Sequence, residues 1–233
     1  MGKKKMPKVI FKFDKEKDLW NNWDTVNYKS PWEKGVKFNK MPILDEICKD
    51  KKFEECKDEI EKFWVKVHNS FLIEEIRIAF QNAWDKINDE FFKRLEKITG
   101  NKFPFDEATV YLTTQGRCPY NFTKGYFFCS LFSNIPNSLI TGGHELMHFD
   151  FHNYDWKTIE KKIGKDKTAD LKEALTVLLN LEFNDLWFIE DKGKPSEGQK
   201  KLRDFIKNEW TKEKNYKSLL DKCVIYAKEK ETQ

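Results

Sequence analysis

The stretch "TGGHELMHFDFHN", from Thr141 to Asn153, holds three of the four histidines in this 233-residue chain. They are His144, His148 and His152, each four residues after the last. Residues four apart lie on one face of an α-helix, so the spacing predicts a helix that presents a row of imidazoles. The two glycines before His144 indicate either a close approach to a neighbouring backbone, for instance that of the preceding strand, or a helix that begins at His144.

Within this stretch, "HELMH" has the spacing H-E-x-x-H. Two imidazoles one turn apart can reach the same Zn²⁺, which makes His144 and His148 candidate metal ligands. Glu145 lies at the edge of their face, where it can accept a proton from a zinc-bound water during attack on a carbonyl. The alternative is an amphipathic helix whose histidines face solvent or make hydrogen bonds in the core.

A third ligand has to come from outside the row of histidines. The three imidazoles span two turns, or about 12 Å of helix rise, whereas zinc–ligand bonds are about 2 Å long. We therefore expect His152 to support the ligands, to face a substrate or to be exposed. The metzincin extension of the motif is missing, because Phe151 stands at its glycine position and Tyr154 at its third histidine position.

The best candidate for the third ligand is Glu173, in the strongly apolar segment "ADLKEALTVLLNLEFNDLWF". This segment predicts one helix with a single polar stripe that includes Glu173, Thr176 and Asn180. If Glu173 binds metal, then Thr176, Asn180 or Asp170 would orient the ligands through hydrogen bonds. The alternative is that the stripe is the solvent-exposed side of a helix buried elsewhere.

An H-E-x-x-H helix followed by a helix that carries a glutamate resembles the gluzincin branch of the zincin metallopeptidases. The resemblance implies that His144, His148 and Glu173 bind zinc and that Glu145 is the general base. It also implies a β-sheet before the active-site helix, whose edge strand would hold an extended peptide through main-chain hydrogen bonds. The β-rich segment at 126–132 is in the right place to be that strand.

The resemblance covers about residues 108–187 and does not identify a subfamily. Thermolysin-like members have the pattern N-E-x-x-x-D around this glutamate, and the present chain departs from it. Lys172 replaces the asparagine and Val177 replaces the aspartate. Gluzincins often use a downstream histidine or tyrosine to stabilise the oxyanion. The candidates for that catalytic role here are His152, Tyr154 and Tyr126.

The remaining sequence predicts a mostly helical α+β fold. Strands are expected at 8–13, 108–114 and 126–132, the last two as a hairpin, and residues 14–41 are expected to be irregular. Apolar residues at steps of three and four predict helix from Leu44 to Thr99, continuous or broken near His68, with Gly100 as its stop. His68 itself lies between apolar positions and is expected to be a core or half-buried residue rather than a metal ligand.

Cap residues predict the later helix boundaries. Asn137 or Ser138 could cap a helix that begins at Leu139, and Thr168 could cap the apolar helix. The remaining signals are a capping box from Ser196 and Gln199 and a last amphipathic helix at 215–228. We therefore divide the chain into a mainly helical region, 1–100, and a zincin-like core with C-terminal helices, 101–233, packed together as one compact unit.

Composition narrows the class of protein. The 43 basic and 39 acidic residues are interleaved, without the basic stripe that a nucleic-acid surface needs. No apolar run reaches the length of about 18 to 20 residues that spans a membrane. Five scattered cysteines and the lack of a signal peptide predict a reducing, cytoplasmic setting.

Three functions are compatible with these features. The favoured one is a cytoplasmic zinc metalloendopeptidase, a hydrolase that cleaves a peptide or protein substrate with Zn²⁺ as cofactor. The second is a zincin-like scaffold that binds a metal or a protein partner without hydrolysing peptides. The third is a helical interaction protein with an accidental H-E-x-x-H motif. The oligomeric state is not predicted.

Overall fold

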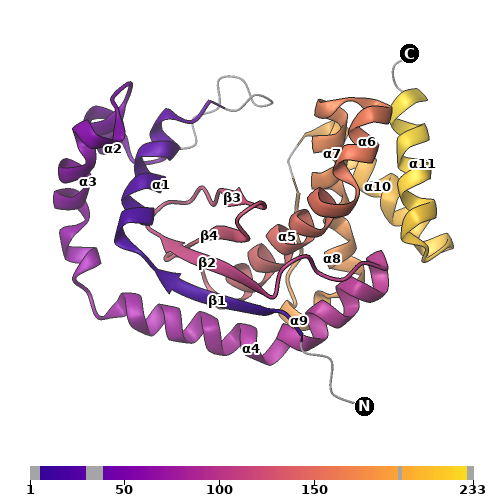
Figure 1. Ribbon diagram of the computed structural model, residues 1–233, viewed down its shortest axis with the longest axis horizontal. Helices are drawn as coiled ribbons and strands as arrows, with labels where there is room; N and C mark the ends of the chain where they lie inside the picture. Colours follow the sequence, from indigo (N-terminus) through magenta and orange to yellow (C-terminus); the bar gives the residue numbers. More distant parts are fainter. Residues whose placement is uncertain (1–5, 30–38, 194–195, 230–233) are drawn as a thin grey trace. The chain divides into compact units, whose positions relative to one another are not determined.

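The computed structural model describes residues 6–29, 39–193 and 196–229 (Figure 1). These residues form many helices and one four-stranded sheet, which confirms the expected α+β class. No helix within them is long and apolar enough to cross a membrane. The chain divides into two compact units: unit 1 takes Met1–Lys8, Lys86–Asp106 and Leu139–Gln233, and unit 2 takes Val9–Asp85 and Glu107–Ser138. This division differs from the boundary expected near residue 100.

Unit 2 contains the sheet, with strand order β1-β2-β4-β3. The strands are β1 (Lys8–Phe13), β2 (Glu107–Thr113), β3 (Tyr120–Asn121) and β4 (Tyr126–Ser130). β2 and β4 are parallel, with Val110 opposite Phe127, so the expected hairpin between them is wrong. Two parallel strands need a connection that returns from the end of the first strand to the level of its beginning, and about a dozen residues between β2 and β4 make this return. β4 also pairs with β3 and is therefore an internal strand, not the expected edge strand.

The helices of unit 2 are α1 (Lys15–Asn27), α2 (Pro42–Cys48), α3 (Phe53–His68) and the first half of α4 (Leu72–Thr99). Of the two alternatives for residues 44–99, the continuous helix is wrong and the break near His68 is present between α3 and α4; a further break, between α2 and α3, was not expected. Gly100, at φ +77°, ends α4 as expected. The segment 14–41 was expected to be irregular, which is wrong for the part that forms α1. The side chain of Asp14 caps this helix by accepting a hydrogen bond from the backbone N–H of Lys17. Residues 30–38 of that segment lie outside the described residues.

A buried polar network fixes α1 to the sheet of unit 2. The carboxylate of Asp18 accepts hydrogen bonds from the Thr113 hydroxyl, at 2.6 Å, and from the Thr114 backbone N–H, at 2.7 Å. His68 Nε2 lies 2.9 Å from the other oxygen of Asp18. The His68 side chain is 4% exposed, so this histidine is a core residue, as its sequence position predicts.

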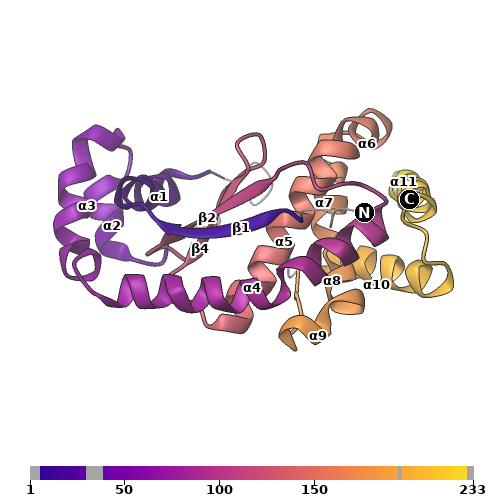
Figure 2. The same cartoon turned by 60° about the horizontal axis from the view of Figure 1, so that its bottom comes forward.

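Unit 1 contains the second half of α4 and most of the later helices. They are α5 (Ile135–Tyr154, from Leu139 onward), α6 (Trp156–Ile163), α7 (Lys165–Leu175), α8 (Val177–Glu182), α9 (Asn184–Trp187), α10 (Glu197–Lys212) and α11 (Tyr216–Glu229). α7 packs against α6 and α10, and α11 packs against those same two helices. Figures 1 and 2 show this group of four helices from two sides.

Several expected helix boundaries in this part of the chain are wrong. α5 begins at Ile135 rather than Leu139, because the helix is capped by Asn134. The side chain of Asn134 accepts a hydrogen bond from the backbone N–H of Asn137. Thr168 lies inside α7, where its hydroxyl donates to the carbonyl of Gly164. The apolar segment, expected as one helix, is divided into α7, α8 and α9.

The last two helices agree with their sequence signals. The Ser196 side chain caps α10 by accepting from the backbone N–H of Gln199, and α11 falls within one residue of its predicted range. The Gln199 side chain does not complete the capping box. It donates instead to the backbone carbonyl and a carboxylate oxygen of Asp170.

Candidate metal centre

The H-E-x-x-H motif lies in the middle of α5, with both histidines on one face. The rings of His144 and His148 are 4.2 Å apart between centroids. The apolar residues between the two histidines, Leu146 and Met147, are buried. Glu145 is buried as well, at 8% exposure.

Glu173, on α7, points its carboxylate at both imidazoles. Its Oε2 lies 3.6 Å from His144 Nε2, and its Oε1 lies 3.5 Å from His148 Nε2. One ligand atom from each of the three residues lies within 4.8 Å of the other two, close enough for a shared metal ion. The tertiary structure therefore brings together the three residues predicted as ligands, although they come from two helices.

Gly143 explains how α5 can pack closely at this point. A Cβ on Gly143 would lie 2.8 Å from Cη2 of Trp187 and 3.2 Å from Cε2 of Phe91. The close approach inferred from the glycine pair is thus present, but the neighbours are aromatic side chains of α9 and α4 rather than a strand. The alternative that the helix begins at His144 is wrong.

Asp191 is the residue of this site that sequence reasoning missed. Its Oδ2 lies 2.6 Å from His144 Nδ1, on the side of the ring away from Glu173. Because a carboxylate only accepts, Nδ1 carries a proton, and Nε2 is the ring nitrogen that would bind a metal, in place of the proton it carries when the imidazole is charged. Asp191 follows α9 in an irregular segment, and nothing in the local sequence "IEDKGKP" marks it as a partner of His144.

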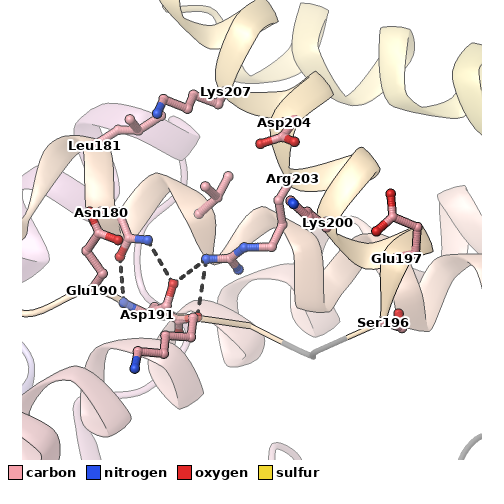
Figure 3. A pocket seen from close by; sticks show the side chains of 12 residues that line it. Asn180, Leu181, Glu190, Asp191, Ser196, Glu197, Lys200, Arg203, Asp204 and Lys207 are labelled. Carbon is pink, nitrogen blue, oxygen red and sulfur yellow. Dashed lines mark hydrogen bonds and ion pairs between the residues drawn. The ribbon is translucent and has the colours of Figure 1, made fainter.

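A set of polar contacts holds Asp191 in place (Figure 3). Asn180 donates to its backbone carbonyl at 2.8 Å and accepts from its backbone N–H at 2.7 Å. The buried guanidinium of Arg203 contacts the same carbonyl and lies 3.4 Å from Oδ1. Asn180 is therefore connected to the candidate ligand His144 through Asp191.

The other two predicted supporting residues have different roles. The Thr176 hydroxyl lies 2.8 Å from the backbone carbonyl of Glu173 and 3.3 Å from Asp191 Oδ1, so Thr176 connects Glu173 to Asp191. Asp170 accepts from Gln199 on α10 and is not part of the ligand group.

The electrostatics of the group depend on burial and on the neighbouring charges. Burial lowers the pKa of His144, but hydrogen bonds to Asp191 and Glu173 outweigh this and raise it to about 10. Burial lowers the pKa of His148 well below its usual value. Burial opposes ionisation of Glu173, but the imidazoles and Lys172 hold its pKa well below the usual range, so the carboxylate is charged.

Glu145 is the buried acid nearest in sequence to the ligands. Burial raises its pKa to about 7. Its Oε2 has no hydrogen-bond partner among the residues that the structure describes. Buried carboxylate oxygens normally have a partner, so this oxygen has an acceptor position available for a water or a ligand.

The chemistry of the donor set fits zinc. Two imidazole nitrogens and one carboxylate oxygen are the ligand types of a catalytic zinc site that keeps a further position open. The side chains of His144 and Glu173 are 21% and 17% exposed, so solvent reaches this side of the group. The side chain of His148 is buried, at 2% exposure.

Each of the three candidates for oxyanion stabilisation makes contacts of its own. The His152 ring stacks on Trp156, with centroids 4.5 Å apart, and burial lowers its pKa to about 4. The Tyr154 hydroxyl donates to the backbone carbonyl of Lys102 at 2.6 Å. Tyr126 belongs to unit 2, where its ring packs against Phe128.

Comparison with known proteins finds no matching family model, no matching curated protein and no matching solved structure.

Proposed function

We propose that this chain is a zinc-dependent metallopeptidase of the gluzincin type, with His144, His148 and Glu173 as zinc ligands. The observation that carries the proposal is that His144 and His148 direct their Nε2 atoms at opposite oxygens of Glu173. Beside them, Glu145 has a buried oxygen without a partner in the described part of the chain.

When bound, zinc would polarise a peptide carbonyl and make water a nucleophile at neutral pH. The chain supplies the remaining functions. Asp191 holds the Nδ1 proton of His144 and so keeps Nε2 directed at the ligand group. Glu145 would take a proton from the attacking water at Oε2 and pass it to the leaving amine. A reducing compartment such as the cytoplasm suits the five cysteines, which are all thiols.

One observation favours a second candidate, a zincin-like scaffold without peptidase activity that can bind a protein partner in place of a metal. Lys172 Nζ lies 2.8 Å from Glu173 Oε1, so a fixed positive charge sits within the ligand group. Such a charge lowers the affinity for a metal cation unless its own hydrogen bonds organise the site.

Metal analysis and one substitution separate these candidates. The purified protein is expected to hold one zinc per chain and to cleave members of a peptide library. Glu145→Gln should keep the zinc and lose cleavage, because the amide cannot accept the proton. If the wild type holds zinc but cleaves nothing in the library, the scaffold is the better description. If it binds no zinc, the peptidase is wrong and a scaffold that binds a protein partner is the better description.

A further inference from the structure

Lys172 is buried against the candidate metal ligands. Its side chain is 6% exposed, although lysine is among the residues least often buried. The neighbouring Leu171, Ala174 and Leu175 are buried with it on α7. A buried ammonium group is costly unless it has a charged partner, and the partner here is Glu173 Oε1, at 2.8 Å.

This contact makes the two oxygens of Glu173 chemically different. Oε1 forms an ion pair with the ammonium group of Lys172 and lies 3.5 Å from His148 Nε2. Oε2 lies 3.6 Å from His144 Nε2. A carboxylate can bind a cation through one oxygen or through both. With an ammonium group on Oε1, a second cation is repelled from that oxygen and favoured at Oε2.

We infer that Lys172 is a positioning residue that makes Glu173 a one-oxygen ligand, bound through Oε2. The inference rests on the proposed zinc site. A Glu173 that bound through both oxygens would occupy one more coordination position. Lys172 keeps that position available for substrate and water, as a catalytic site with three protein ligands requires.

The number of ligands can be measured without any catalytic assay. Cobalt(II) commonly replaces zinc, and the intensity of its visible absorption falls as the coordination number rises, so geometry can be read from the spectrum. Lys172→Met removes the ammonium group and keeps an unbranched apolar stem of similar length. The expected result is a severalfold weaker absorption per bound cobalt, because Glu173 then binds through both oxygens.

Two further variants make the result specific. Lys172→Arg keeps a cationic donor next to Oε1 and should restore the wild-type spectrum. Lys165→Met makes the same substitution at an exposed position of α7, and its spectrum should be that of the wild type. If Lys172→Met folds, binds cobalt and gives the wild-type spectrum, the inference is wrong.

X-ray absorption of the zinc-loaded wild type tests the inference if the Lys172→Met variant does not fold. Binding of the carboxylate through one oxygen supports it, and binding through both overturns it. The result is distinct from a failure of the proposed function. If the spectrum changes in Lys172→Met but the wild type cleaves no peptide, the proposed peptidase activity is wrong and the inferred role of Lys172 is supported. A wild type that binds neither metal would overturn both.

Discussion

His144 Nδ1 lies 2.6 Å from Asp191 Oδ2, and this contact joins the H-E-x-x-H helix to the segment that follows α9. Asp191 is in turn held by Asn180 of α8 and Arg203 of α10. The orientation of one candidate ligand thus depends on three elements far from it in the sequence. Such outer hydrogen bonds fix the tautomer and ring angle of metal-binding histidines.

Asp191→Ala is therefore expected to weaken zinc binding by about 10- to 100-fold, the usual effect of removing such a partner. Competition with a chromophoric chelator measures the affinity. Asp204→Ala is the matched control, because Asp204 lines the same pocket as Asp191 and Arg203 (Figure 3) but is exposed. An Asp191→Ala variant that folds and binds zinc like the control would show that Asp191 does not support the ligand.

His148→Ala should abolish stoichiometric zinc binding, whereas His152→Ala should retain it. The reason is that His148 faces Glu173, and His152 stacks on Trp156 one turn further along α5. Excess zinc should stabilise the wild type and His152→Ala by about 4 kcal/mol at 1,000 times Kd, and leave His148→Ala unchanged. Thermal denaturation with and without zinc tests this. Loss of the zinc effect in His152→Ala would contradict the assignment of ligands.

Gly143→Ala should lower the free energy of unfolding by about 1–3 kcal/mol, the range for an overpacked core. The added Cβ would lie 2.8 Å from the buried ring of Trp187, which has Phe183 stacked on it. Urea denaturation measures the loss. Gly198→Ala in α10 is the control: its Cβ meets nothing within 4 Å, so alanine should be neutral or stabilising there. Equal effects at both positions would exclude a packing role for Gly143.

Asp155 makes a pH-dependent contribution to stability. Burial raises its pKa to about 6, against a hydrogen bond from Tyr216 that lowers it. Because the folded pKa lies above the unfolded one, stability from this group is present below about pH 4 and is lost as the pH rises through 6. Asp155→Asn should therefore be more stable than the wild type at pH 7, and this advantage should shrink towards pH 4. Urea denaturation at the two pH values measures it. An advantage that is the same at both would contradict the shift.

The sequence by itself determined the features that depend on neighbours in the chain. The four-residue spacing placed His144 and His148 on one helix face, and the apolar steps predicted the helices on either side of His68. Local alternation gave the range of β1, and the Ser196 cap gave the start of α10. In each case the signal lies within a few residues, because helix periodicity and capping are short-range properties.

Only the tertiary structure decided the features that join distant segments. Glu173 could be proposed from its polar position in an apolar segment, but its distance from the imidazoles is set by the packing of α5 and α7. The partnership of Asp191 with His144 and the parallel pairing of β2 with β4 left no local pattern. A hydrogen bond or a strand pair is selected by which surfaces meet when the core is buried, and that choice is spread over the whole chain.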